Sequence, residues 1–335
     1  MMHSSSARSN LLLSLALVLA LALTACAPQR AAGGEQPPPA ASSELQGTIR
    51  VSGAWALYPM MVKWAEEFQK VHPKVRIDVS AGGAGKGVAD ALASLVDIGM
   101  VSREVRPEEV KQGAFYLPVV KDAVFPVINA GNPTLQALAQ KGVGKQTFVD
   151  LWIKGEALTW GEIAGTDSRD VVQVYTRSDS CGAAETWAKY LGGAQEDLKG
   201  TAVYGDPGLA EAVKKDLFGI GYNNLNYAYD AKSGLPLAGL YVVPIDVNGN
   251  GKTDPEEDMA TKSQALQAII SGVYPSPPAR DLYLLTKGKF NSLSTEFVRW
   301  ILTDGQKYVD ETGYIQLAKS QIDEALKKLE PQGQG

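Results

Sequence analysis

The feature that most constrains the fold of this chain is a short apolar strand, followed by a loop of small residues and an amphipathic helix, which occurs three times. These units are expected over residues 48–68, 75–95 and 171–191. A further strand at 96–101 ends at the polar pair Ser102-Arg103. Repeats of this kind are typical of α/β proteins, in which helices cover a parallel sheet. The sequence therefore predicts an α/β fold.

The loops that open these helices indicate an anion site. The first N–H groups of a helix have no partner within the helix and carry partial positive charge, and small residues let a ligand approach the backbone. Arg103 and Arg177 stand at strand ends beside such loops. Any tight strand-to-helix turn also favours glycine, so the indication comes from the combination of the loops with two arginines. The stretch 81–87 lacks the ending of a phosphate-binding P-loop and the glycine spacing of a dinucleotide site.

Arg177 and Asp179 are the side chains with the clearest chemistry. A planar guanidinium can bind two oxygens of an oxyanion at once. Asp179 is expected either to orient Arg177 or to accept a proton from the ligand, which would select phosphate over sulfate because only phosphate is still protonated at neutral pH. The alternative interpretation is an ordinary surface ion pair.

The N-terminus predicts export from the cytoplasm. Arg8 precedes the apolar run 11–23, which is too short to span a membrane. Leu-Thr-Ala before Cys26 resembles the lipobox of bacterial lipoproteins, which implies cleavage after residue 25 and a lipid anchor on Cys26; the alternative is a plain signal peptide. Residues 26–46 are expected to form a flexible tether and 331–335 a disordered tail.

Composition argues against nucleic-acid binding and against catalysis. The formal net charge is −5, without clustered Lys and Arg. With Cys26 lipidated, Cys181 stands alone and no intramolecular disulfide can form. Histidine is limited to His3 and His72, so the sole conceivable nucleophile pair is Cys181 with His72. We expect no enzyme activity; Cys181 is either a reactive thiol at a helix start or, as we favour, a small residue in place of serine.

The stretch 246–257 matches a calcium-binding loop at every specified position. Thr253 stands where such loops usually carry an apolar residue, and a strand-like segment precedes the loop. We therefore expect a structural Ca²⁺ site, with a metal-free Asn-Gly turn as the alternative. The expected ligands are Asp246, Asn248, Asn250, Lys252 through its carbonyl, Asp254 and Glu257.

Over about residues 47–320 the chain resembles the phosphate-binding proteins of bacterial ABC importers. The most specific stretch is 177–182, Arg-Ser-Asp-Ser-Cys-Gly, which is similar to the family's Arg-x-Asp-Gly-Ser-Gly-Thr. Weaker matches lie at 53–65, 82–88, 96–99, 205–222 and 313–315.

The resemblance implies a type II periplasmic-binding-protein-like fold, in which two lobes, each a mostly parallel sheet flanked by helices, close on a ligand. By the family's connectivity, lobe 1 comprises 47–127 plus 283–330, and lobe 2 comprises 128–282. The implied protein is a monomeric, lipid-anchored receptor outside the cytoplasm that binds inorganic phosphate and delivers it to a membrane permease. The implied ligand contacts are Leu57, Tyr58, Ala84, Gly85, Ser102, Arg103, Arg177, Asp179, Ser180, Cys181, Gly182 and Ala183.

This sequence departs from the family at hydroxyl and carboxylate positions. Where the family has Ser, Thr, Thr, Ser and Asp, this chain has Cys181, Ala183, Leu57, Ala84 and Ser102. The proton-accepting carboxylate is then Asp179 or is missing, so sulfate, molybdate or tungstate stays open as the ligand. An extracellular hydrolase and a sensory or adhesion module are the alternatives from other classes.

Overall fold

A computed structural model describes residues 44–330 of the protein. The predicted leader, Cys26 and the tail at 331–335 lie outside the described residues, as does the tether up to residue 43. Within residues 44–330, no helix has the length and apolar character that crossing a membrane requires.

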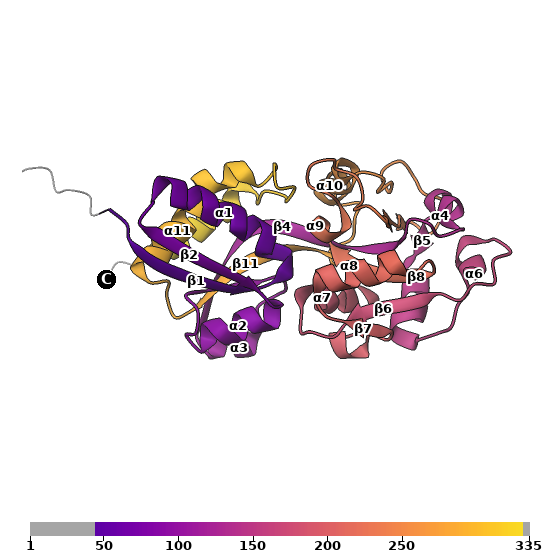
Figure 1. The fold of residues 1–335 in the computed structure, drawn as a ribbon, viewed down its shortest axis with the longest axis horizontal. Helices are drawn as coiled ribbons and strands as arrows, with labels where there is room; N and C mark the ends of the chain where they lie inside the picture. The colour runs from indigo at the N-terminus through magenta and orange to yellow at the C-terminus, as the bar shows by residue number, and fades with distance from the viewer. Residues whose placement is uncertain (1–43, 331–335) are drawn as a thin grey trace, which may run out of the picture. The chain divides into compact units, whose positions relative to one another are not determined.

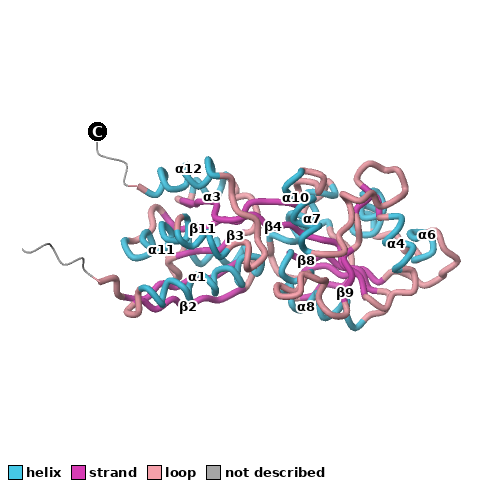
Figure 2. The backbone as a smooth tube through the Cα atoms, turned by 90° about the horizontal axis from the view of Figure 1, so that it is seen from above, coloured by secondary structure: helices cyan, strands magenta, loops and turns pink. Residues whose placement is uncertain are grey.

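Two groups of strands and helices lie side by side, joined by two long strands (Figures 1 and 2). The joining strands are β4 (Ala114–Asn129) and β11 (Ala279–Lys287), which are antiparallel. The first half of β4 pairs with β11, while its second half pairs with β8 (Gly219–Asn224) and β9 (Leu240–Val242). One hydrogen-bonded sheet path, β2-β1-β3-β11-β4-β8-β6-β7, therefore runs through both groups.

The first group is built on three parallel strands, β1 (Gly47–Gly53), β2 (Val75–Ala81) and β3 (Ile98–Val101). Apolar residues of α1 repeat at helical spacing and bury Met60, Trp64 and Phe68 against this sheet. The helices of this group are α1 (Tyr58–Val71), α2 (Ala84–Leu92), α3 (Pro107–Lys111), α11 (Ser292–Leu302) and α12 (Lys319–Leu329). A 3-10 turn, η1 (Trp55–Leu57), links β1 to α1.

The second group contains the parallel strands β6 (Gln173–Arg177), β7 (Thr201–Val203) and β8. A small separate sheet pairs β5 (Val143–Gly144) with β10 (Ile245–Asp246). The helices of this group are α4 (Leu135–Lys141), α5 (Lys145–Val149), α6 (Trp160–Ala164), α7 (Gly182–Leu191), α8 (Gly205–Lys215), α9 (Leu225–Ala228) and α10 (Lys262–Ser271).

Each group has its own large hydrophobic core. One core draws its buried residues from 49–120 and 282–329, and the other from 123–279. We call residues 44–120 and 282–330 lobe 1, and residues 123–279 lobe 2. The lobe boundaries expected from the sequence, after 127 and after 282, stay predictions. The predicted two-lobed α/β fold is confirmed, with the antiparallel β4 and β11 added to the parallel strands.

The parallel strands place the candidate site. Strands β1 and β2 lead into α1 and α2, and strands β6 and β7 lead into α7 and α8. In open α/β sheets, ligands bind outside the carboxyl ends of the strands, where helices begin. A ligand site is therefore expected at the carboxyl ends of these four strands.

Candidate anion-binding site

The second and third of the predicted loops, at 82–87 and 177–183, meet between the lobes. The Gly85 N–H, in the first turn of α2, donates a hydrogen bond of 3.2 Å to the Ser180 carbonyl of lobe 2. A Cβ on Gly83, where φ is +93°, would lie 2.6 Å from that same carbonyl oxygen. A Cβ on Gly182 would overlap the carbonyl of Ser102, which follows β3. Glycine is thus required at two of these positions because the backbones of the two lobes touch.

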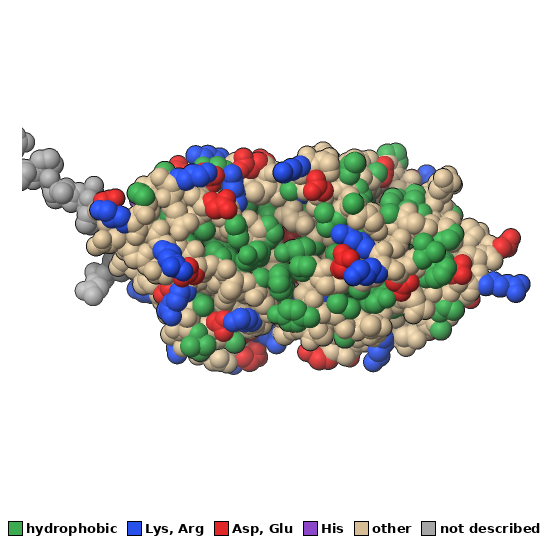
Figure 3. All heavy atoms as spheres, viewed as in Figure 1, with side chains coloured by type: hydrophobic (Ala, Val, Ile, Leu, Met, Phe, Trp, Pro, Cys, Tyr) green, Lys and Arg blue, Asp and Glu red, His purple; other side chains and the backbone are tan. Residues whose placement is uncertain are grey.

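The first loop approaches lobe 2 at a different point. The ring of Trp55 lies against Gly205, at the start of α8, and makes an edge contact with the ring of Tyr204, at 6.2 Å between centroids. Figure 3 shows hydrophobic side chains gathered between the lobes on this face. The first loop therefore closes one side of the interlobe region with apolar surface.

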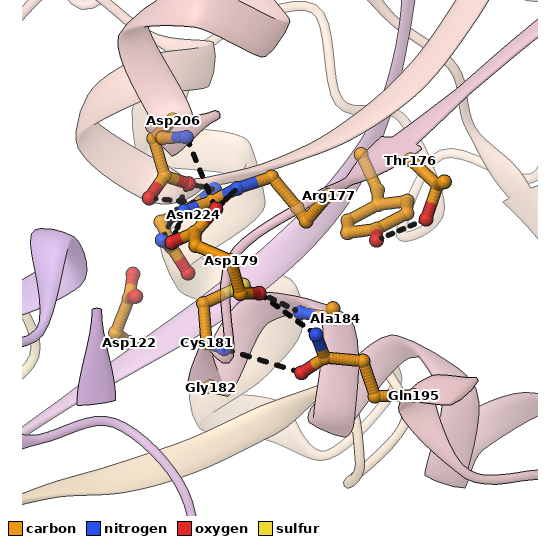
Figure 4. A network of polar contacts seen from close by, with 12 residues as sticks. Asp122, Thr176, Arg177, Asp179, Cys181, Gly182, Ala184, Gln195, Asp206 and Asn224 are labelled. Carbon is orange, nitrogen blue, oxygen red and sulfur yellow. Dashed lines mark hydrogen bonds and ion pairs between the residues drawn. The ribbon is translucent and has the colours of Figure 1, made fainter. Parts of the chain in front are cut away.

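Arg177 lies between two carboxylates at the end of β6 (Figure 4). Its Nε and Nη2 donate to the two Asp179 oxygens at 2.8 and 2.7 Å, and its Nη1 lies 2.9 Å from Asp206 Oδ2. The Arg177 and Asp206 side chains are buried, with 0% and 1% of their surface exposed. Burial lowers the pKa of Arg177, but the charges of Asp206 and Asp179 outweigh it, so the pKa is raised and the guanidinium stays charged.

The loop that carries Arg177 is held by hydrogen bonds to its own lobe. Asp179 Oδ1 also accepts from the Gly205 N–H at 3.1 Å, which fixes the start of α8 next to the arginine. Gln195 donates to the Asp179 carbonyl and accepts from the Cys181 N–H. These bonds fix the loop that follows Arg177 and hold Asp179 in place beside the guanidinium.

Cys181 is the N-cap residue of α7, and its sulfur accepts from the Ala184 N–H at 3.4 Å. The residue is 4% exposed, and burial raises the pKa of the thiol to about 12. A thiolate is the reactive form of cysteine. The geometry thus favours the interpretation of Cys181 as a small capping residue in place of serine.

A second buried arginine, Arg280 of β11, lies behind the first. Its Nη1 donates to the Gly182 carbonyl at 2.7 Å, and its Nη2 lies 3.3 Å from Asp122 Oδ2 and contacts the Asn224 side chain. Burial raises the pKa of Asp122 to about 6, although Arg280 opposes the shift. Because Arg280 and Asp122 sit on β11 and β4, this pair connects the strands that join the lobes to the start of α7.

The structure places the predicted lobe 1 residues as follows. The amides of Leu57 and Tyr58 donate to the carbonyls of Ala54 and Trp55 within η1, although the resemblance implied that they face a ligand. Ala84 is buried at the first position of α2. Arg103 pairs with Glu109 at 2.6 Å and with Glu185 of α7 at 3.2 Å. Arg103 of lobe 1 therefore forms an ion pair with Glu185 of lobe 2 in this arrangement.

In lobe 2, Gly182 and Ala183 form the first turn of α7, where backbone N–H groups lack intrahelical partners. Ser180 is exposed; its carbonyl accepts from the Gly85 N–H of lobe 1, and its hydroxyl also lies against Gly85. Together with Arg177 and Asp179, these residues form the part of the predicted set that the structure gathers most closely.

Sequence reasoning missed Asp122, Asp206, Asn224 and Arg280. These buried polar side chains come from four different elements, so spacing along the chain does not connect them. Asp206 lay inside a stretch that carried the family resemblance, 205–222, and an acidic residue in the first turn of a helix was the available signal.

A groove of about 740 Å³ also lies between the lobes, on the side of Arg280. Its lining includes Arg103, Glu185, Lys189, Arg280 and Tyr283. Lys189 pairs with Glu104 at 2.8 Å, and Arg106 pairs with Glu185 at 2.7 Å. The charged side chains along this groove are mostly matched in interlobe pairs.

The loop 246–257 folds around its own carboxylates. Asp246 accepts from the N–H groups of Gly249, Asn250 and Gly251, and Glu257, which is buried, accepts from those of Val247 and Asp254. Asp254 accepts from the Asn248 and Asn250 side chains and pairs with Lys252. Within 44–330, no three His, Cys, Asp or Glu side chains are grouped so that they could hold a metal ion.

The family model described as "PBP superfamily domain" matches residues 38–305, most of the chain. The chain belongs to this family. Members are solute-binding proteins, so this protein is a binding protein and not an enzyme.

Two relatives are phosphate-binding proteins PstS. The protein from Bacillus subtilis (strain 168) is 25% identical over 283 residues, covering 83% of this chain and 84% of the relative. That from Methanocaldococcus jannaschii is 25% identical over 335 residues, covering 82% of this chain and 83% of the relative.

Solved structures of two other proteins share the fold. A protein from Clostridium perfringens, described as a phosphate ABC transporter substrate-binding protein with bound phosphate, has a TM-score of 0.67 and 21% identity, covering 81% of this chain and 100% of its own. An ABC-type phosphate transport receptor from Vibrio cholerae has a TM-score of 0.58 and 17% identity, covering 80% of this chain and 100% of its own.

Proposed function

We propose that this protein binds inorganic phosphate between its lobes and delivers it to an ABC importer. The observation that carries the proposal is the buried Arg177 at the start of the loop that leads into α7, a loop whose Ser180 and Gly182 meet the backbone of lobe 1. A guanidinium and free helical amides are the donors that tetrahedral oxyanions require. The PstS relatives, which cover most of the chain, support phosphate as the ligand.

The test is the melting temperature of the purified protein against phosphate, arsenate, sulfate, molybdate and tungstate. A ligand that binds the native state alone must raise the melting temperature. We expect the largest increase with phosphate and a dissociation constant in the micromolar range or below by calorimetry. An equal or larger increase with sulfate, molybdate or tungstate would move the assignment to that oxyanion, and no increase with any of them would contradict the proposal.

Lipid anchoring at Cys26 is part of the proposal and concerns the segment outside the described residues. The lipobox-like Leu-Thr-Ala-Cys supports it. We expect the protein to fractionate with membranes of the expressing bacterium and its C26S variant to be released as a soluble exported protein. Equal membrane association of both would contradict the anchor. We expect the exported protein to be monomeric by light scattering.

We also retain structural calcium binding by loop 246–257 as a proposal. The oxygen-rich spacing supports it, and Gly251 has the left-handed φ of +77° that the sharp turn of such a loop needs. Asp246, Asp254 and Glu257 would exchange their present hydrogen bonds for the ion. We expect Ca²⁺ to raise the melting temperature relative to chelator, and D246N to remove the increase; equal melting temperatures with and without Ca²⁺ would overturn the proposal.

A further inference from the structure

The indole nitrogen of Trp55 is a buried donor without a hydrogen bond. Within residues 44–330, Trp55 Nε1 has no acceptor, although the atom is shielded from solvent. A buried donor that stays unmatched costs free energy, and such a group in a native structure calls for an explanation. Because an indole N–H can only donate, the partner that it lacks is an acceptor.

A second unmatched indole shows what is particular to Trp55. Trp187 Nε1 is also buried without a partner, but its ring packs on Phe148 and Tyr222 inside the lobe 2 core. The Trp55 ring belongs to lobe 1 and lies against Tyr204 of lobe 2. Its donor is therefore at the boundary of the lobes, where the ligand is expected, and not inside one lobe.

The Trp55 ring turns its nitrogen-bearing edge towards the start of α8. A Cβ on Gly205 would lie 3.3 Å from both Cε2 and Cζ2 of Trp55, and Cε2 is the ring carbon bonded to Nε1. Contacts with the rings of Tyr204 and Tyr58, at 6.2 and 6.5 Å between centroids, hold the indole in this orientation. The indole N–H therefore lies on the ring edge that faces Gly205.

The same part of α8 adjoins the arginine of the site (Figure 4). The Gly205 N–H donates to Asp179 Oδ1 at 3.1 Å, and Arg177 Nη1 lies 2.9 Å from Asp206 Oδ2. Although paired in charge with Asp206, Arg177 Nη1 makes no hydrogen bond within residues 44–330. Two unmatched N–H donors, one from each lobe, therefore lie beside the first two residues of α8.

A tetrahedral oxyanion is a group that could satisfy both donors. Its oxygens are all acceptors, and they can take hydrogen bonds from nitrogens on different elements. Hydrogen bonds to a charged acceptor are roughly twice as strong as those between neutral groups. Because Trp55 and Arg177 belong to different lobes, an anion held by both is fully bound only while the lobes are in contact.

The first loop offers few other side-chain donors. Among residues 54–58, Ala-Trp-Ala-Leu-Tyr, only Trp55 and Tyr58 carry one. Leu57 stands where the resembled family carries a threonine, and the amides of Leu57 and Tyr58 are engaged within η1. The indole N–H of Trp55 can thus replace the missing hydroxyl from a different position of the loop.

We propose that Trp55 is a ligand-contacting residue of the site: its Nε1–H donates to an oxygen of the oxyanion that Arg177 holds. This inference rests on the proposed function and adds to it a side-chain donor from lobe 1. A neutral group that only donates does not distinguish protonated from unprotonated oxyanions. Trp55 therefore contributes to affinity and to closure of the lobes, and not to the choice between phosphate and sulfate.

The first test compares the wild type, W55F and W55Q by calorimetry with phosphate. W55F keeps an aromatic ring and removes the N–H, whereas W55Q removes the ring and restores a side-chain N–H donor. We expect phosphate affinity to fall about tenfold or more in W55F, because a hydrogen bond to a charged group is lost. W55Q should bind phosphate more tightly than W55F.

Tyr204→Phe is the matched control, because it changes the ring beside Trp55 and leaves the indole in place. We expect it to alter phosphate affinity by less than about threefold, since an exposed hydroxyl makes a small contribution. Circular dichroism and melting temperature establish that each variant is folded.

Proton–nitrogen NMR of the indole groups tests the contact directly. The signal that W55F and W55Q lack belongs to Trp55. We expect it to move downfield as phosphate is added, in step with the calorimetric affinity. The indoles of Trp64 and Trp160 donate to the carbonyls of Gly305 and Phe218 at 2.9 and 3.0 Å within their own lobes, so their signals should stay in place.

The outcomes separate this inference from the proposed function. A wild type that binds no oxyanion contradicts the proposed function. A wild type that binds phosphate, with equal affinity in folded W55F, overturns the assignment of Trp55 and leaves the receptor function standing. A Trp55 signal that bound phosphate does not move also overturns it, and this measurement on the wild type decides the matter should W55F not fold.

Discussion

The two lobes contribute unlike chemistry to the same site. Lobe 1 brings backbone and small residues, with Gly83 and Gly85 packed against Ser180, and the charged Arg103 is committed to ion pairs. Lobe 2 brings the buried charges of Arg177 and Asp206. Backbone can approach any anion of the right shape, whereas a fixed carboxylate distinguishes protonation states. We therefore expect lobe 1 to supply backbone contacts to the ligand and lobe 2 to supply the buried charge.

The largest effect is expected from Arg177→Ala, which removes the lobe 2 cation. Phosphate affinity should fall more than tenfold. The unliganded protein should also lose about 3–5 kcal/mol of stability, because Asp179 and Asp206 would be left buried without a counter-charge. Calorimetry and denaturant unfolding measure the two losses, and the exposed Arg169→Ala of the same lobe is the control. Unchanged phosphate affinity would refute the expectation that lobe 2 supplies the cation that binds phosphate.

Gly182→Ala tests the backbone contact between the lobes. A Cβ at this position would overlap the Ser102 carbonyl, so closure should be hindered and phosphate affinity reduced about tenfold or more. The stability of the unliganded protein should change little, because alanine is a good helix former at the start of α7 and the lobes can separate. Gly144→Ala is the control, since a Cβ there meets no atom within 4 Å. If G182A binds like the wild type, the close approach of the backbones is not needed for binding.

A smaller effect is expected from the exposed ion pairs that span the lobes. Glu104 and Lys189 lie 2.8 Å apart and are 76% and 53% exposed, so their coupling should be about 0.2–1 kcal/mol and should weaken with salt. A double-mutant cycle of E104Q and K189Q on the phosphate dissociation rate measures it, at low and high salt. The cycle is informative because these residues lie away from Arg177. Zero coupling at low salt would show that the pair does not hold the lobes together.

An effect confined to alkaline pH concerns Lys262 of α10, whose Nζ lies 2.6 Å from Asn226 Oδ1 and 3.5 Å from the Thr312 carbonyl in lobe 1. Burial lowers the pKa of Lys262 to about 8 from the usual 10.5. Between these values the unfolded chain binds the proton and the folded protein does not, so this group makes the free energy of unfolding rise with pH, by at most about 3 kcal/mol.

K262M should remove that rise. Below pH 8, its free energy of unfolding should vary with pH in parallel with that of the wild type. Denaturant unfolding from pH 7 to 10.5 measures it, and Lys70→Met, an exposed lysine of α1, is the control. A wild-type profile that does not rise relative to K262M over this range would show that the buried amine is not penalised.

Local patterns predicted the elements of this fold well where a short strand meets a small-residue loop. The unit expected at 171–191 contains β6 and α7, and the strand expected at 96–101 is β3. The second strand–helix unit was expected to reach 95, but α2 ends at Leu92 and Leu95 is 62% exposed. Helix ends depend on tertiary contacts more than on apolar spacing, so such boundaries were the weakest part of the prediction.

The site likewise contains residues that the sequence predicted and residues that it did not. Arg177 and Asp179 were predictable, because two residues on one loop are neighbours in any fold. Asp206 and Arg280 were not, because they come from the start of α8 and from β11, and distance along the chain says nothing of their approach to Arg177.

By itself, then, the sequence determined the α/β class, the glycine backbone that lets the lobes touch, and one arginine with its orienting carboxylate. Each of these depends on residues that are close along the chain. The tertiary structure alone decided that a second carboxylate lies 2.9 Å from the same guanidinium, and that the strands joining the lobes place a second arginine behind it. Burial from several elements creates these contacts, and burial sets the free energy of an unmatched charge.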